Sequence, residues 1–61
     1  MGWWKTVEHE DGRKTTIRRT VNGGYAAEKG GWLGPERIGY GDTVEEAEQA
    51  AKDSRGSPIK K

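Results

Sequence analysis

The residues that could carry out catalysis are few and widely spaced in this chain. His9 is the one histidine, there is no cysteine, and the only serines are Ser54 and Ser57. A Ser–His–acid arrangement would need one of these serines to reach His9 from a helix end or a tail, and nothing in the sequence indicates this. Carboxylates flank His9, but no second group has metal-ligand spacing, so we interpret the segment as a solvated hairpin tip. We therefore expect that the protein is not an enzyme and that it binds neither a metal ion nor a cofactor.

Length and composition predict one small domain. The 61 residues carry a formal net charge of +1, and 30% of them are hydrophobic. No apolar run approaches membrane-spanning length, and without cysteine there are no disulfides, so we expect a cytoplasmic protein that does not contact membranes. Since aliphatic residues are scarce, four of the five aromatic residues are expected to supply most of the core. These four are Trp3, Tyr25, Trp32 and Tyr40.

Alternating β-branched and aromatic residues predict extended segments at 3–9, 13–21, 25–29 and 36–40. A three-residue loop ending at Gly12 sets Trp4 opposite Arg18 and Val7 opposite Thr15. A second three-residue loop at 22–24 sets Tyr25 opposite Val21. The glycine-rich segment 30–35 is expected to break regular structure.

Two further expectations concern the ends of these segments. Trp32 and Leu33 should pin the glycine-rich loop to the core. In the register set by Gly12, the side chains of Trp3, Val7, Ile17 and Val21 should share the core face of the sheet.

The segment that follows predicts a helix from Val44 to Ser54. Thr43 and Glu46 have the spacing of a capping box, and Gly56 suits the C-terminal cap. A narrow stripe of Val44 and alanines can cover only one face of a sheet. The predicted fold is therefore α+β: a three- to four-stranded antiparallel sheet, a meander of hairpins, packed on one C-terminal helix. Residues 1–56 should form this domain, and residues 57–61 a flexible basic tail.

The sheet face that the helix leaves open is the candidate binding site. It combines an exposed tryptophan, cations and hydroxyls, which suit phosphate contacts and insertion into a nucleic-acid groove. An uncovered tryptophan also favours a binding role over a merely solvated face. The candidate residues are Trp4, Thr6, Arg13, Lys14, Thr16, Arg18 and Thr20.

Two stretches resemble a known family. Tyr25-Ala26-Ala27-Glu28 is similar to the aromatic-Ala-Ala-Glu strand of DNA-binding domains of the AP2 and phage-integrase arm-binding type. The segment 39–47, continued by 50–53, resembles their last strand and helix start. The resemblance implies that the sheet face away from the helix reads DNA through Lys14, Thr16 and Arg18.

Together these observations predict a small non-enzymatic binding module of phage or mobile-element type. The first expectation is binding of double-stranded DNA, with Lys14, Arg18 and Arg13 on phosphates and Trp4 and Thr16 near the groove. The alternative is a protein-binding regulator, such as a phage inhibitor of a host enzyme or defence complex, that masks a protein surface. A third possibility is self-association through an edge strand. No small-molecule substrate is expected, and a phage-derived protein would act in the cytoplasm of a bacterial host.

Overall fold

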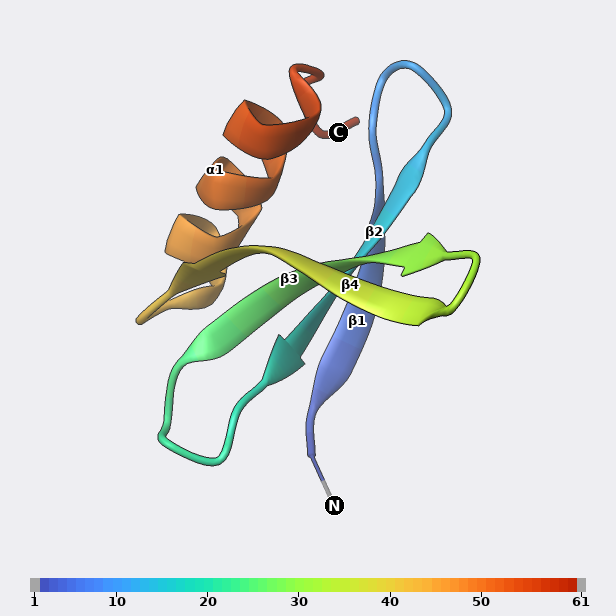
Figure 1. The fold of residues 1–61 in the computed structure, drawn as a ribbon. Coiled ribbons are helices and arrows are strands. Elements are labelled where there is room, and N and C mark those ends of the chain that lie inside the picture. Colours follow the sequence, from blue (N-terminus) through green and yellow to red (C-terminus); the bar gives the residue numbers. More distant parts are fainter. Residues whose placement is uncertain (1, 61) are drawn as a thin grey trace.

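The computed structural model describes residues 2–60 and shows an antiparallel sheet with one helix packed on one of its faces (Figure 1). The sheet order is β1-β2-β3-β4. The elements are β1 (Trp4–Glu8), β2 (Lys14–Arg19), β3 (Tyr25–Gly31), β4 (Gly34–Gly41) and α1 (Val44–Arg55). The predicted α+β architecture is confirmed. Each strand is joined to the next by a hairpin, so the sheet is a meander.

The first hairpin has the predicted register. Gly12 adopts a φ of 92°, and the His9 amide donates to the Arg13 carbonyl at 2.7 Å, which closes a three-residue loop. Trp4 therefore lies opposite Arg18, and Val7 opposite Thr15. This register places Ile17, which is fully buried, under the helix.

In the second hairpin the loop lies one residue earlier than predicted, which shifts the pairing of the two strands by two residues. The Thr20 amide donates to the Gly24 carbonyl at 2.8 Å, and Gly23 has a φ of 92°, so the loop is residues 21–23. Tyr25 pairs with Arg19 instead of Val21. Because side chains alternate with a period of two, Tyr25 keeps its predicted face, while Val21 moves into the turn and is fully exposed. Both loops place glycine third, where the left-handed backbone is needed.

Glycines let the helix approach the sheet backbone. A Cβ on Gly39 would lie 2.7 Å from the Ala50 Cβ, and one on Gly41 would lie 2.6 Å from the Ala47 amide nitrogen. The helix thus packs directly against β4, with small side chains between the two. The fully buried core cluster is Ile17, Ala27, Ala47 and Ala51, with Tyr25 and Ile38 packed against it.

The prediction of an aromatic core is largely wrong. Trp3 and Tyr40 are 46% and 41% exposed, and Trp32 is 96% exposed. Leu33 is also exposed, so neither Trp32 nor Leu33 pins a loop to the core. Tyr25 alone packs on the core, and the Trp3 ring meets it edge to face at 5.7 Å between centroids. The close approach of the helix to β4 leaves no room for an indole between them.

The helix ends follow the sequence prediction closely. The Thr43 hydroxyl accepts from the Glu46 amide at 3.2 Å, while the Glu46 carboxylate accepts from the Asp42 amide at 3.0 Å. At the other end Gly56 adopts a φ of 69° and donates its amide to the Lys52 carbonyl. The helix extends one residue beyond the predicted end.

The predicted flexible tail is not free in residues 57–60. Ile59 forms an antiparallel bridge with His9 at the outer edge of the sheet. The Glu10 amide donates to the Pro58 carbonyl at 2.8 Å, and the Lys60 amide donates to the Glu8 carbonyl at 2.7 Å. The segment attaches because β1, an edge strand, offers unpaired backbone groups. Lys61 lies outside the described residues.

Candidate binding face of the sheet

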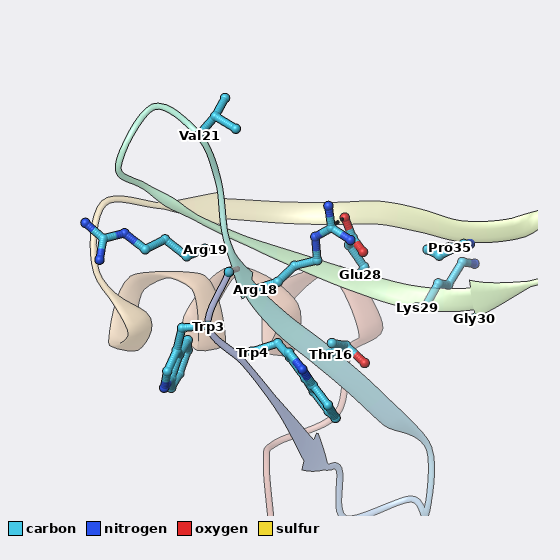
Figure 2. A pocket seen from close by; sticks show the side chains of 11 residues that line it. Trp3, Trp4, Thr16, Arg18, Arg19, Val21, Glu28, Lys29, Gly30 and Pro35 are labelled. Atoms are coloured by element: carbon cyan, nitrogen blue, oxygen red, sulfur yellow. Dashed lines mark ion pairs between the residues drawn. The ribbon is translucent and has the colours of Figure 1, made fainter.

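The sheet face opposite the helix holds a groove of about 620 Å³ (Figure 2). Its walls come from the start of β1, the end of β2 with the turn after it, and the β3–β4 hairpin. Such a volume lies within the range of about 300–1,000 Å³ that suits side chains or small ligands. The residues that line it are Gly2, Trp3, Trp4, Thr16, Arg18, Arg19, Val21, Glu28, Lys29, Gly30 and Pro35.

Three of the predicted site residues meet in this groove. Trp4 is 66% exposed, as predicted for the open face, and Thr16 lies beside it on β2. Arg18, the cross-strand partner of Trp4, also lines the groove. Thr6 pairs with Thr16 on the same face and is exposed, but lies outside the lining.

The charge of Arg18 is shared with a neighbouring strand. Its Nε lies 3.5 Å from Glu28 Oε2, so the guanidinium extends toward β3 instead of standing free on β2 (Figure 2). Glu28 is paired with Thr16 in the sheet and is mostly covered. The predicted phosphate ligand is therefore already partly neutralised, although Arg18 remains more than half exposed.

Arg13, Lys14 and Thr20 lie away from the groove. The Arg13 guanidinium contacts the Asp11 carboxylate at 2.6 Å and donates to the Arg55 carbonyl at 2.9 Å. It thus supports the C-terminal end of the helix, which corrects its predicted place on the binding face. Lys14 is exposed near the far end of β2, and the Thr20 hydroxyl bonds to Asn22 within the second hairpin.

The Arg13 contact gives Asp11 a pH-dependent role. Hydrogen bonds from the Arg13 side chain and amide hold the pKa of the Asp11 carboxyl below its ordinary value of 3.8. A lowered folded-state pKa adds stability that is complete above the unfolded-state pKa and is lost as pH falls through the folded one. We expect Asp11→Asn to lower stability at neutral pH and to leave it unchanged at the acid limit. Urea unfolding from neutral to acidic pH measures this, and equal losses at both ends would contradict it.

Several groove residues were missed by the sequence analysis. Arg19 and Lys29 add two cations, while Val21 and Pro35 add apolar walls. The second hairpin turns one residue earlier than predicted, which moves Val21 into the turn beside the groove, and the shared X-X-Gly pattern of the two loops is the signal that could have shown it. Lys29 lies in a predicted strand but was not assigned to the site, while Gly30 and Pro35 belong to strand continuations that the glycine-rich sequence concealed.

Beside the groove, Tyr40 covers part of the open face. Its ring lies across Gly24, where a Cβ would meet the phenol oxygen at 1.9 Å. The hydroxyl donates to the Asn22 side-chain oxygen at 3.1 Å, and the Arg37 guanidinium lies 5.9 Å from the ring centroid. Tyr40 therefore fastens β4 to the second hairpin.

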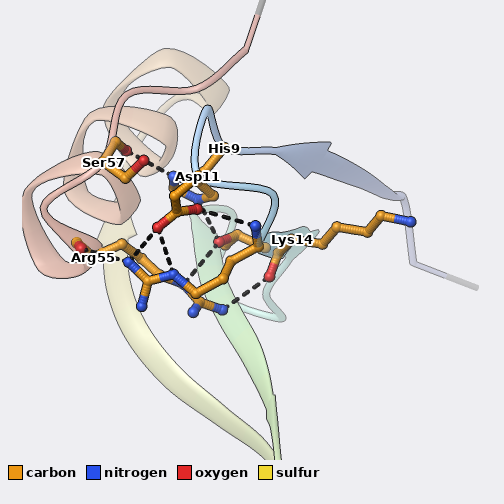
Figure 3. A network of polar contacts seen from close by, with 7 residues as sticks. His9, Asp11, Lys14, Arg55 and Ser57 are labelled. Atoms are coloured by element: carbon orange, nitrogen blue, oxygen red, sulfur yellow. Dashed lines mark hydrogen bonds and ion pairs between the residues drawn. The ribbon is translucent and has the colours of Figure 1, made fainter.

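A buried polar cluster lies at the opposite end of the molecule (Figure 3). His9 is fully buried; its Nδ1 donates to the Ser57 carbonyl at 2.7 Å, and its Nε2 accepts from the Thr15 hydroxyl at 2.6 Å. Arg55 Nε donates to the same hydroxyl at 3.3 Å. His9 is not the solvated tip expected from the sequence. Ser57 does reach it, but through its carbonyl, and a buried ring with both nitrogens engaged positions the chain instead of contacting a substrate.

No family model, no curated protein and no solved structure matches this chain. The similarity of the second half to AP2-type and integrase arm-binding domains stays a prediction. Within residues 2–60 there is no cluster of three metal-ligating side chains, and the helix there is neither long nor apolar enough to cross a membrane.

Proposed function

We propose that this protein is a protein-binding module whose groove on the open sheet face accepts an extended segment of a partner protein. The observation that carries this proposal is Trp4, a large side chain left 66% exposed as the wall of a groove of about 620 Å³. Aromatic and arginine side chains that stand together on a surface are the residue types that dominate the energy of protein interfaces.

The charge of the groove selects the chemistry of that segment. Among the charged lining residues Arg18 and Lys29 are cations and Glu28 is an acid, a formal sum of +1, whereas Arg19 pairs with Tyr25 and its side chain extends away from Arg18 (Figure 2). Trp4, Val21 and Pro35 supply apolar wall, whereas the Trp3 ring packs on Tyr25. A segment with an aromatic or aliphatic side chain next to aspartate or glutamate complements both features.

Two contacts favour a protein over DNA as the partner. Of the three cations expected on phosphates, Arg13 is held by Asp11 and the helix end, and Arg18 is shared with Glu28. The apolar walls match a protein side chain better than a sugar–phosphate backbone. In this role the chain acts as a small regulator that covers part of its partner.

Selection of random peptides displayed on phage tests this function. We expect enriched peptides with an apolar residue beside an acid, and we expect Trp4→Ala to fold normally and to weaken their binding by about tenfold or more. Trp32→Ala is the matched control, since Trp32 is exposed outside the groove, and it should bind as the wild type does at low protein concentration.

Two results would contradict the proposal. One is the absence of peptides whose binding depends on Trp4. The other is binding of a short duplex DNA that is lost in Trp4→Ala and falls steeply from low to moderate salt, because this slope marks phosphate contacts.

A further inference from the structure

The turn between β3 and β4 exposes two large apolar side chains, Trp32 and Leu33, which we call the apolar tip. Gly31 pairs with Gly34, so these two residues form the whole turn. They are 96% and 95% exposed, and no described residue covers them. Adjacent apolar side chains at the end of a hairpin mark a contact site, because their exposure to water is unfavourable.

The same molecule holds a concave site that fits this convex one. The groove has apolar walls on both sides and a volume of about 620 Å³, enough for a tryptophan and part of a leucine. Glu36 follows the apolar tip by three residues, but it is the cross-strand partner of Lys29, one of the groove's own cations, so its charge lies beside that cation within the same molecule. The fit of the tip to the groove therefore rests on the apolar surfaces of both.

We propose that the apolar tip of one copy inserts into the groove of a second copy, and that the exchange is reciprocal in a two-fold dimer. Lys29, Gly30 and Pro35, which line the groove, lie at the base of the hairpin that carries the tip. Tip and groove thus form one continuous self-complementary surface, the condition for an isologous contact that closes at two copies. The inference rests on the groove of the proposed function, but not on its peptide partner.

The size of the contact implies a weak dimer. Each buried tryptophan removes roughly 150–250 Å² from water, and the walls it covers lose a similar area. Two reciprocal insertions therefore bury about 600–1,000 Å², below the roughly 1,200–2,000 Å² of stable specific interfaces. A weak dimer that covers both grooves also keeps the apolar tips out of water until a partner segment displaces them.

Sedimentation equilibrium over a wide concentration range, up to millimolar protein, tests the dimer. We expect the wild type to approach twice the monomer mass and the double variant Trp32→Ala/Leu33→Ala to dimerise at least about tenfold more weakly. Trp4→Ala should weaken dimerisation similarly through the groove. Gln49→Ala, on the exposed side of the helix, is the control and should leave the dimer unchanged.

Mixing the two defective variants tests reciprocity. An equimolar mixture of the tip variant and Trp4→Ala should dimerise more strongly than either variant by itself. In the mixed dimer, the intact tip of Trp4→Ala can still enter the intact groove of the tip variant. If the wild type stays monomeric at all concentrations, the proposal is wrong. If the measured mass exceeds that of two copies, the closed two-fold arrangement is wrong.

Membrane insertion of the tip is the competing outcome. A monomeric wild type that cosediments with phosphatidylcholine vesicles, in a manner that needs Trp32 but not Trp4, overturns the dimer. The dimer and the proposed function can be tested independently. The tip variant should still bind the selected peptides, so a result that excludes the dimer does not contradict peptide binding by the groove. A Trp32-dependent dimer without Trp4-dependent peptides contradicts the proposed function alone.

Discussion

Gly41→Ala is expected to lower the stability of the protein strongly. The new Cβ would lie 2.5 Å from the Glu46 Cβ and 2.6 Å from the Ala47 amide nitrogen. Since the backbone of α1 is part of that contact, the helix must move away from β4. Overpacking of this kind costs about 1–3 kcal/mol. A core of this size rarely supplies more than about 3–5 kcal/mol, so the melting temperature should fall by roughly 10–20 °C.

Gly30→Ala is the matched control for this substitution. Gly30 also lies in a strand, but a Cβ there meets no atom within 4 Å, and its φ is not positive. Thermal unfolding followed by circular dichroism should show a wild-type melting temperature for Gly30→Ala. Equal melting temperatures for Gly41→Ala and the wild type would show that the helix is not held close to β4 as described.

Local signals were sufficient to predict the elements of this fold. The capping residue Thr43, the C-terminal Gly56 and the turn glycine Gly12 each act within a few residues of the chain, so their effects can be inferred from sequence. They gave the helix to within one residue and the first hairpin register without error. The prediction that Trp4 lies on the open face of the sheet followed from that register.

The core could not be predicted in the same way, because it depends on how closely two distant elements pack. Gly39 and Gly41 look like strand-weakening residues in sequence, yet they allow the helix to lie on β4. Tyr40, which lies between these glycines, therefore points to the open face and stays 41% exposed. Large apolar side chains are expected in a core on hydrophobicity alone, yet here Trp32 and Leu33 form the exposed tip and Val21 lies in a turn.

The buried cluster around His9 was also beyond local reasoning. His9 and Ser57 are 48 residues apart, and only the return of the chain after α1 brings them together. Arg13 is absent from the candidate site for a similar reason. Its guanidinium donates to the backbone carbonyl of Arg55 at the end of the helix, 42 residues away in the sequence. Arg18 was placed on the correct strand, but its ion pair with Glu28 on the next strand was not predicted.

His9→Ala is expected to have the second large effect, on both stability and the C-terminal segment. The substitution leaves the buried Ser57 carbonyl without its partner, at about 1–3 kcal/mol, leaves the Thr15 hydroxyl with Arg55 alone, and opens a cavity that costs about 2–5 kcal/mol more. The total approaches the whole stability of a domain this size. Urea unfolding should therefore show the midpoint collapse toward zero denaturant, whereas Glu10→Ala, whose side chain is exposed, should unfold as the wild type does.

Hydrogen exchange separates this effect from a general loss of stability. The Lys60 amide donates to the Glu8 carbonyl and the Glu10 amide to the Pro58 carbonyl, so both report attachment of the segment 57–60. Because His9 holds Ser57, we expect both amides to exchange faster than those of the β2–β3 ladder in whatever folded His9→Ala remains. Wild-type protection of these two amides, or a loss of stability below about 0.5 kcal/mol, would contradict the role assigned to His9.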